Sequence, residues 1–478
     1  MVLINSVSGI RGTIGARSGE GLTPVDTVKF TTAFARFILQ NRRGDGKARV
    51  IIGRDARPSG VMVSNIVAAT LTACGIDVVN VGLTTTPTLE IAVVDLQGEG
   101  GIAITASHNP KQWNALKLLN HRGEFLSAKE ASVVHELSRL DDFEYASPSS
   151  LGRYHNDAAA LERHLDKILA LPLVNVEAIR AARFRVAVDG ISSGGGMAVP
   201  ALLRRLGVED IECLYCEPTG EFPHNPEPLA ENLGELSEMV IKSNAHVGFA
   251  VDPDVDRLAI VMEDGEMFGE EYTLVAVADY ILQHKKGNTV SNLSSTMALR
   301  DITLKAGGEY FASAVGEPHV VKMMKARKAV IGGEGNGGVI YPDLHYGRDA
   351  LAGIALFLSY LATSGKSCSV LRNAYPNYFI SKNKLTLDPE MDVDDIMQKM
   401  RERYSKQPVD NTDGIRIEFN DEWVHLRKSN TEPVIRIFSE SDSIVKAETL
   451  ASKIINDIRE IVKIKTNGFT EEDRKICR

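Results

Sequence analysis

Short apolar runs and longer stretches of mixed polarity alternate along the first part of the chain. The runs at 48–55, 76–82 and 100–105 have the length and composition of buried strands, and 59–74 is predicted to be a helix that stops at Gly75. Strands separated by helices are typical of βαβ units, which build a mainly parallel sheet.

The same alternation occurs twice more, so the units repeat an architecture rather than a sequence. The second unit is predicted to contain a Gly-rich turn at 192–196, a helix at 197–207, and strands at 183–190, 210–216 and 245–252. The third unit is predicted to contain helices at 270–284 and 349–365 and strands at 288–293 and 328–334. A helix at 155–169 is expected to connect the first unit to the second.

The last part of the chain has a different pattern. Residues 414–441 are predicted to form antiparallel strands with alternating faces, followed by a helix of about twenty residues from Ser443. The segment 378–392 opens this module. We therefore expect an α/β protein in which three βαβ-type, mixed-sheet units precede a C-terminal α+β unit.

The composition is that of an ordinary globular protein with several cores. A length of 478 residues suggests about three domains, and 44% of the residues are apolar. The net charge of −9 argues against a nucleic-acid-binding protein, because phosphate backbones need a basic surface. It does not argue against a phosphorylated small substrate, which needs only a few local cations.

Cysteine usage and the lack of long apolar runs suggest a compartment for the protein. No apolar run reaches membrane-spanning length, and the first residues lack the features of a signal peptide. Five scattered cysteines suggest a reducing environment, so we expect a cytoplasmic protein without membrane association. Cys213 and Cys216 form a Cys-x-x-Cys pair, but no second pair follows, which disfavours a zinc or redox role.

The clearest chemical signal is "VDPDVDR" at 251–257. Asp252, Asp254 and Asp256 alternate directly after an apolar strand, and a tight loop there would aim three carboxylates at one point. Carboxylate oxygens suit a hard divalent cation such as Mg²⁺, and three of them repel one another unless a cation neutralises them. The alternative is an acidic surface turn. We expect a metal site here.

The stretch "TASHNP" at 105–110 places Ser107 and His108 after an apolar strand. The Gly-x-Ser-x-Gly elbow of hydrolases is absent. Taken alone, Ser107 is as compatible with a turn cap, and His108 with a structural hydrogen bond. Other motifs must decide between these interpretations.

Two further stretches carry polar groups in turns. In "GGEGNGG" at 332–338, glycines would allow a ligand to approach the backbone, while Glu334 and Asn336 offer groups suited to sugar hydroxyls. In "RKSNTEP" at 427–433, Arg427 can grip a phosphate in a bidentate fork. A flexible turn and a polar hairpin remain the alternatives. The other residues expected at this anion site are Ser429, Asn430, Thr431 and Arg436.

These four stretches, in this order, resemble the loops of the α-D-phosphohexomutase superfamily over nearly the whole chain, and "SGIRG" at 8–12 resembles its N-terminal signature. Among its members the chain looks most like phosphoglucosamine mutases and phosphoglucomutase/phosphomannomutases. The family has four domains around a central cleft, with one loop from each. The expected domains are 1–150 with the phosphoserine loop, 151–255 with the metal loop, 256–370 with the sugar loop and 371–478 with the phosphate loop.

The resemblance implies that Ser107 carries a phosphoryl group and that Mg²⁺, one per chain, is held by this serine and the three aspartates. The implied reaction moves phosphate between O6 and O1 of a hexose through a 1,6-bisphosphate, which also acts as activator. The implied ligand is a phosphosugar, and the implied assembly is a monomer or homodimer that binds no nucleic acid. The loop of Arg427 would hold the phosphate that is not reacting.

The reaction also needs a base for the attacking hydroxyl and an acid for the leaving one. Lys117 occupies the family's lysine position, and a lowered pKa would suit it to this role; a salt-bridged strand lysine is the alternative. His108, Arg11 and Arg257 are also expected among the catalytic residues, with both arginines near the reacting phosphate, although Arg257 could instead form a structural ion pair. His319 is a weak candidate, because the family position of a nearby histidine corresponds here to Glu317.

Two details qualify the resemblance. The chain has Asn114-Ala115 where the family usually has Asn-Gly, and alanine has less access than glycine to left-handed backbone conformations, which bears on the shape of the serine loop. Asn336 in the sugar loop favours glucosamine phosphates over glucose or mannose phosphates. A metal-dependent sugar phosphatase and a non-catalytic sugar-phosphate-binding relative are the other functional classes.

Overall fold

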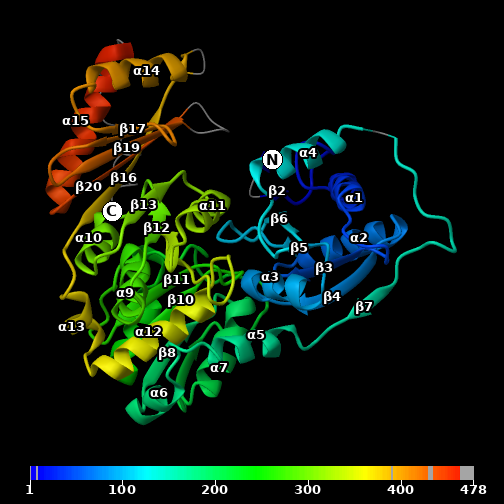
Figure 1. Ribbon diagram of the computed structural model, residues 1–478, viewed down its shortest axis with the longest axis horizontal. Helices are drawn as coiled ribbons and strands as arrows, with labels where there is room; N and C mark the ends of the chain where they lie inside the picture. Colours follow the sequence, from blue (N-terminus) through cyan, green and yellow to red (C-terminus); the bar gives the residue numbers. More distant parts are fainter. Residues whose placement is uncertain (1, 7–8, 141, 389–390, 429–433, 463–478) are drawn as a thin grey trace.

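The computed structural model describes residues 2–6, 9–140, 142–388, 391–428 and 434–462, and it divides into four α/β units (Figure 1). Each unit has its own sheet, and the first three sheets mix parallel and antiparallel pairs. This confirms the expected fold class. None of the described helices combines the length and the apolar content needed to cross a membrane.

The first unit is a seven-stranded sheet covered on both faces. Its strands, in spatial order, are β1 (Leu3–Ser6), β2 (Gly9–Thr13), β6 (Trp113–Asn120), β5 (Gly100–Ile104), β3 (Arg49–Arg54), β4 (Asp77–Leu83) and β7 (Tyr154–Asn156). Its helices are α1 (Pro24–Gln40), α2 (Gly60–Ala73), α3 (Thr86–Asp95) and α4 (Ala128–Leu137). Val50 and Ile52 pack under α1 and α2, whereas Ile51 packs under α3, as the two-residue period of a strand requires.

The second and third units share one hydrophobic core. The second sheet contains β11 (Leu258–Met262), β10 (Val247–Val251), β8 (Arg185–Asp189) and β9 (Asp210–Leu214), with helices α5 (Ala160–Leu169), α6 (Val176–Ala182), α7 (Gly194–Arg205) and α8 (Gly234–Ser243) and the 3₁₀ turn η1 (Ala230–Asn232). Phe357 packs edge-on against Phe249 of this sheet and against Phe268. The two units therefore form a continuous body.

The third unit supplies the helix that carries Phe357. Its sheet contains β13 (Tyr310–Ser313), β12 (Thr289–Asn292), β14 (Ile331–Glu334) and β15 (Gly338–Ile340), and its helices are α9 (Glu270–His284), α10 (Met297–Lys305), α11 (Glu317–Arg327), α12 (Ala350–Ser364) and α13 (Cys368–Arg372). Most of α12 is buried between the two units.

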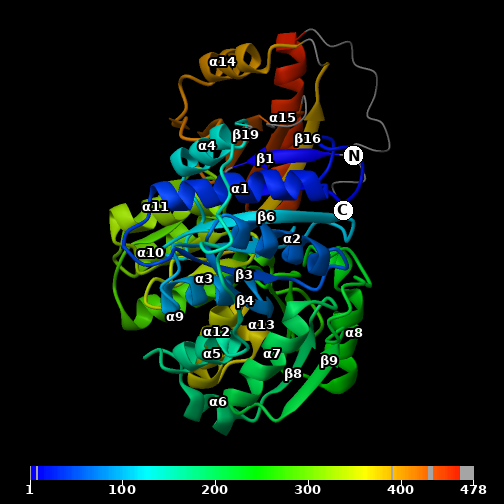
Figure 2. The same cartoon turned by 90° about the vertical axis from the view of Figure 1, so that its right-hand side faces the viewer.

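The fourth unit is fully antiparallel and confirms the predicted α+β module. Its sheet contains β16 (Phe379–Thr386), β20 (Val434–Ser441), β19 (Trp423–Lys428), β18 (Ile415–Glu418) and β17 (Val409–Asp410), packed against α14 (Val393–Arg403) and α15 (Ile444–Val462). Figure 2 shows this unit above α1 and β1 of the first unit.

Strand pairing corrects the expected limits of the units. Residues 155 and 156, expected to begin a connecting helix, belong to β7, which pairs with β4. The helix therefore starts only at Ala160, and the first sheet continues past residue 150. Likewise β11 pairs with β10, which carries the second sheet past the expected limit at residue 255. The limit expected after residue 370 falls inside α13.

Candidate active site

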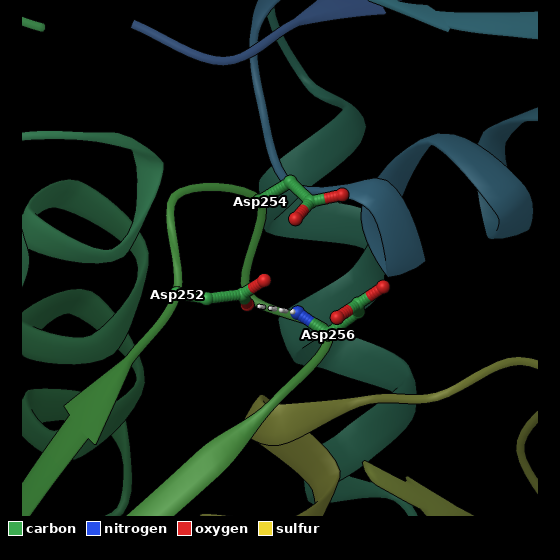
Figure 3. Close-up of side chains that lie close together, drawn as sticks. All are labelled: Asp252, Asp254 and Asp256. Atoms are coloured by element: carbon green, nitrogen blue, oxygen red, sulfur yellow. Dashed lines mark hydrogen bonds between the residues drawn. The ribbon is translucent and has the colours of Figure 1, made fainter. Parts of the chain in front are cut away.

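The loop between β10 and β11 brings three aspartates together (Figure 3). One carboxylate oxygen each from Asp252, Asp254 and Asp256 lies within 4.8 Å of the others, and all three side chains are buried. The backbone N–H groups of Asp256 and Arg257 each donate to Asp252 Oδ1 at 3.1 Å. Val255 has φ 64°, an unfavourable conformation for a β-branched residue, so the loop stores strain to hold this geometry.

The donor atoms of this loop fit a hard divalent cation. Asp254 Oδ1 and Asp256 Oδ1 are buried without a hydrogen-bond partner, which is costly for a carboxylate unless a cation lies nearby. Carboxylate oxygens are also ligands that Mg²⁺ prefers. Within the described part of the chain, no other group of three or more potential ligands converges in this way.

The cysteine pair shows no such arrangement. Cys213 is exposed and Cys216 is half-buried, and both are free. Burial, followed by the neighbouring Cys213, raises the pKa of the Cys216 thiol, so the thiolate needed for metal binding or redox chemistry is disfavoured.

Charge repulsion within the aspartate loop affects its members differently. Burial first, and then the charges of Asp256 and Asp254, raise the pKa of Asp252 well above its usual value. Burial also acts to raise the pKa of Asp254, but the charge of Lys117 and the hydrogen bonds from Lys117, Thr86 and Asp252 together outweigh burial, so the net pKa is lowered. Asp254 also accepts hydrogen bonds from Lys117 Nζ and Thr86 Oγ1, both at 2.6 Å.

Ser107 lies against this loop although it is distant in sequence. Its Oγ donates to Asp252 Oδ2 at 2.6 Å, and the side chain is buried. Ser107 has φ 49°, in the left-handed region. His108 Nδ1 lies 3.3 Å from the same Oγ. The loop therefore presents the serine hydroxyl to the aspartates, which a simple turn cap does not require.

The position of Ala115 in the sheet explains why alanine can replace the family's glycine there. Ala115 lies in β6 and pairs with Arg11 of β2, so its backbone is extended and needs no left-handed conformation. The left-handed residue of the serine loop is Ser107 itself.

Arg57 holds the serine loop in place, and the sequence reasoning did not identify it. Its guanidinium donates to the backbone carbonyls of Ser107, Asn109 at 2.6 Å and Pro110 at 2.7 Å. Asp55 accepts from Arg57 Nε at 2.9 Å and neutralises it in a fully buried pair. The signal was present in "GRDARPSG" at 53–60, where three charged residues follow a buried strand.

Lys117 lies between two of the aspartates. Its Nζ is 2.6 Å from Asp254 Oδ2 and 3.4 Å from Asp256 Oδ2, and the residue is buried. Burial acts to lower the pKa of Lys117, but the two carboxylates raise it above its usual value. The expected lowering is therefore wrong for this arrangement, in which Lys117 is a cation.

Two arginines complete the cation-rich rim of the site. Arg11 Nη1 donates to Asn109 Oδ1 at 2.6 Å. Arg257 Nη1 pairs with Glu227 Oε1 at 3.0 Å, the structural ion pair that was its alternative role, while its buried Nε has no hydrogen-bond partner. Burial first, and then the charges of Arg257 and Arg11, lower the pKa of His108 well below its usual value, so this imidazole is neutral.

The sugar loop joins the same site through a second buried arginine. Glu334 ends β14, and its Oε1 accepts from Asn292 Nδ2 and from the Gly316 N–H, both at 2.9 Å. Asn336 Oδ1 is buried and has no hydrogen-bond partner, which leaves it available to a ligand. Arg348 Nη1 lies 3.1 Å from Glu334 Oε2.

Arg348 connects this loop to the metal loop. Its Nη2 donates to Asp256 Oδ2 at 2.6 Å, and its Nε donates to Glu317 Oε2 at 2.8 Å. The sequence reasoning missed Arg348, because "YGRDA" at 346–350 reads only as the start of a helix. One guanidinium thus forms ion pairs with three carboxylates from three separate segments.

The expected phosphate loop is only partly described. Ser429, Asn430 and Thr431 lie outside the described residues. Arg427 and Arg436 face each other in neighbouring strands, and Lys384 is the next residue in the same cross-strand row. Like charges in direct cross-strand register are destabilising, so this row favours a bound anion. Arg427 Nε also lies 2.8 Å from Asp413 Oδ2.

A cavity of about 690 Å³ separates this row from the first unit. Its lining includes Arg11 on one side and Arg427, Lys428 and Arg436 on the other. Cations face this cavity from both sides. Its lining contains none of Ser107, the three aspartates, Glu334 or Asn336, so it adjoins the reacting groups rather than enclosing them.

Comparison with known proteins finds four domains in the same order. Family profiles of the phosphoglucomutase/phosphomannomutase domains match in order: α/β/α domain I at 4–143, domain II at 162–265, domain III at 269–378 and the C-terminal domain at 384–457. Each of the four loops, as the sequence defines it, falls within a different matched domain.

Similar proteins align over almost the full chain. A phosphoglucomutase/phosphomannomutase of Thermococcus kodakarensis is 35% identical, covering 95% of this chain and 99% of that protein. A probable phosphoglucosamine mutase of Methanopyrus kandleri is 32% identical, covering 95% and 98%. A solved phosphoglucomutase/phosphomannomutase family protein of Burkholderia thailandensis superposes with a TM-score of 0.83 at 25% identity, covering 97% and 99%. The chain therefore belongs to the phosphoglucomutase/phosphomannomutase family of the α-D-phosphohexomutases and is a phosphohexomutase.

Proposed function

We propose that Ser107 is the phosphate carrier of this phosphohexomutase. The observation that carries the proposal is the 2.6 Å hydrogen bond from Ser107 Oγ to Asp252 Oδ2, since it places the hydroxyl at the edge of the aspartate cluster. A phosphoserine there would bring a charge of about −1.5 to −2. Arg11, Lys117 and Arg257 are the side-chain cations placed to compensate it.

We also propose that Asp252, Asp254, Asp256 and the phosphorylated Ser107 hold one Mg²⁺ per chain. When bound, the cation supplies Lewis-acid stabilisation of the charge that develops on the phosphoryl oxygens. The chain's own residues do the rest. Arg57 fixes the serine loop, and Lys117 supplies a proton to Ser107 Oγ when the phosphoryl group leaves and recovers it when the group returns.

The reaction that fits this layout has two halves. In the first, the phosphoryl group passes from Ser107 to the free hydroxyl of a hexose phosphate and gives a 1,6-bisphosphate. In the second, the bisphosphate turns over between the four loops and returns its other phosphate to Ser107. Arg427 and Arg436 hold the phosphate that is not reacting, and Glu334 and Asn336 bind sugar hydroxyls in both orientations.

For the sugar, we propose glucosamine phosphate as the preferred substrate, with glucose and mannose phosphates as the alternatives. The buried, unpartnered Oδ1 of Asn336 supports an amino sugar, because it can accept a hydrogen bond from the ammonium group of the substrate. The names of the relatives include both classes, phosphoglucosamine mutase and phosphoglucomutase/phosphomannomutase.

Replacement of Ser107 tests the carrier. Ser107→Ala should lose mutase activity by more than about 10³-fold, because the covalent carrier is gone, while the fold is retained. The assay is phosphorus NMR of hexose 6-phosphate with a trace of 1,6-bisphosphate, and Ser149→Ala, at an exposed position outside the cavity lining, is the matched control. A Ser107→Ala rate near that of the control would contradict the proposal.

The same assay addresses substrate and metal. Glucosamine, glucose and mannose 6-phosphates run in parallel should show isomerisation without release of inorganic phosphate, fastest for glucosamine. Release of inorganic phosphate as the main product would instead indicate a sugar phosphatase. Chelation should abolish turnover and added Mg²⁺ should restore it; full activity after exhaustive chelation would exclude the role of the aspartate loop.

A further inference from the structure

Glu317 is a buried carboxylate between the sugar loop and the metal loop. It is the first residue of α11, and the preceding residue, Gly316, donates its N–H to Glu334 Oε1 at 2.9 Å. On its other side, Arg348 joins Glu317 to Asp256 of the metal loop, with bonds of 2.8 and 2.6 Å. A sugar that Glu334 binds and that reacts at Ser107 would extend from the sugar loop to the metal loop, and Glu317 lies between them.

The two oxygens of Glu317 have different surroundings. Oε2 is fixed by Arg348 Nε, whereas Oε1 is buried and has no hydrogen-bond partner. A carboxylate that served only as a counter-ion for Arg348 would need only Oε2. A buried acceptor without a partner is costly, so the unpartnered Oε1 is an acceptor for which a substrate hydroxyl between the two loops would be a partner.

The surroundings of Glu317 bring its pKa close to neutrality, where a carboxyl can both accept and donate a proton. Burial first, and then Asp256 and Glu334, act to raise the pKa of Glu317, while Arg348 acts to lower it, and the net value is about 7. Glu90 of α3 is a second buried carboxyl in electrostatic contact with Glu317, and its pKa is raised to about 8. Carboxyls with a pKa near neutrality suit general acid–base catalysis.

We propose that Glu317 accepts the proton of the attacking sugar hydroxyl and later returns it to the leaving sugar oxygen, with Arg348 as its positioning partner. This inference rests on the proposed mutase reaction. It assigns the sugar-side proton to Glu317 and leaves Lys117 on the serine side of the phosphoryl group.

The transfer balances in both halves. In the first half, the sugar O–H proton goes to Glu317 Oε1 as the sugar oxygen bonds to phosphorus; the P–Oγ bond breaks, and Ser107 Oγ takes its electron pair with a proton from Lys117. In the second half, Ser107 Oγ–H gives its proton back to Lys117 as it attacks the other phosphate. Glu317 then protonates the sugar oxygen that leaves.

Conservative variants separate this role from a purely structural one. Glu317→Gln keeps an oxygen that can accept from Arg348 Nε but cannot take a proton. For the hexose 6-phosphate that the wild type converts fastest, kcat should fall by about 10²- to 10³-fold with KM changed less than about threefold. The matched control is Glu238→Gln on the exposed face of α8, which should keep wild-type constants.

The pH profile supplies the readout that a structural role would not change. Because the carboxylate form is needed to accept the proton, wild-type kcat should fall as the pH decreases through about 7. This acidic limb of the pH profile, in which kcat falls toward low pH, should be absent in Glu317→Gln. A defect of Glu317→Gln confined to KM, or a limb that persists in this variant, would overturn the proposal.

A replacement variant and a measurement on the wild-type enzyme complete the test. If Glu317→Gln does not fold by circular dichroism, Glu317→Asp replaces it: its lower kcat should come with a displaced limb, and an unmoved limb would overturn the role of Glu317. Absence of isomerisation by the wild-type enzyme with any hexose phosphate would instead overturn the mutase reaction itself, so the two failures are distinguishable.

Discussion

Two buried guanidinium groups organise the active site at the scale of single residues. Arg57 binds three backbone carbonyls of the serine loop, and Arg348 serves three carboxylates. Arginine suits both positions because its planar fork directs five N–H donors in fixed directions, which a lysine ammonium cannot reproduce. Each group depends on buried acidic partners, so the site is sensitive to the loss of either partner.

The buried pair of Arg57 and Asp55 gives a stability prediction. Arg57→Met should destabilise the first unit by about 3–5 kcal/mol, because it leaves Asp55 buried without a cation. The measurement is denaturant unfolding followed by hydrogen exchange in β3. Adding Asp55→Asn to this variant should recover part of the loss, since the uncompensated charge is removed. A double variant that is less stable than Arg57→Met would contradict this account.

At the scale of elements, the same device positions each functional loop. The serine, metal and sugar loops each connect a central strand to a neighbour that returns antiparallel: β5 to β6, β10 to β11 and β14 to β15. In the fourth unit β19 and β20 pair in the same way around the phosphate loop. A short loop between two antiparallel strands holds polar side chains at the end of a buried strand, where they are no longer covered by the sheet.

A buried network ties three helices together behind these loops. Asp349, the N-cap of α12, accepts from His164 of α5 at 2.8 Å and from His345 at 3.1 Å, and Glu90 of α3 lies 3.2 Å from His345. Burial acts to lower the pKa of His345, but Asp349 and Glu90 raise it to about 10. His345 is therefore protonated in the folded protein near neutral pH.

This network predicts a specific pH dependence of stability. A histidine whose pKa is raised on folding stabilises the protein fully below its unfolded pKa, and this stabilisation is lost as the pH rises toward the folded value of about 10. The apparent melting temperature should therefore fall more between pH 7 and 9 for the wild type than for His345→Asn. His284→Asn, on α9, is the control. Parallel curves for the wild type and His345→Asn would contradict the assignment.

Much of this organisation could be predicted from the sequence, and the rest could not for physical reasons. Strands and helices with strong apolar patterns were predicted within a few residues, as α9 and α15 show. β7 was missed because it is a short, fully exposed edge strand without an apolar signal. Ser107 and the aspartates were expected to meet, and the 2.6 Å bond between Ser107 and Asp252 shows that they do.

Residues that act through distant partners were not predictable. Arg348 and Thr86 reach the metal loop from segments far away in sequence, and nothing local marks their partners. The pKa of Lys117 was expected to be lowered by burial beside an arginine and a metal. The two carboxylates that raise it are brought there by tertiary packing, which the sequence does not show. Short local motifs therefore specified the loops, whereas the groups that position them required the assembled units.

At the scale of the whole molecule, the cationic residues Arg427 and Arg436 of the fourth unit face the first unit across a cavity. Arg427 and Arg436 line one side of the 690 Å³ cavity and Arg11 lines the other. The fourth unit is attached to the third through contacts such as Ser294 Oγ with His425 Nδ1 at 2.9 Å. An anion with two phosphates can bridge the cations on both sides of the cavity.

Binding of a bisphosphate should therefore bring the fourth unit closer to the first. Small-angle X-ray scattering with glucose 1,6-bisphosphate should show a smaller radius of gyration for the wild type, because phosphates attract cations from both units. Arg427→Ala should lose most of this change, whereas Lys399→Ala on the exposed face of α14 should retain it. An identical decrease in Arg427→Ala would show that this arginine does not participate.

The side chain of Arg348 occupies the space that a side chain at position 338 would need. A Cβ added at Gly338 would lie 2.4 Å from Arg348 Cδ, and the guanidinium cannot move aside without leaving Asp256, Glu317 or Glu334. Any larger side chain at position 338 would therefore take the shared cation away from all three carboxylates at once. Engineering new specificity into the sugar loop will require paired substitutions at 338 and 348, since either one alone passes through an intermediate with a broken charge balance.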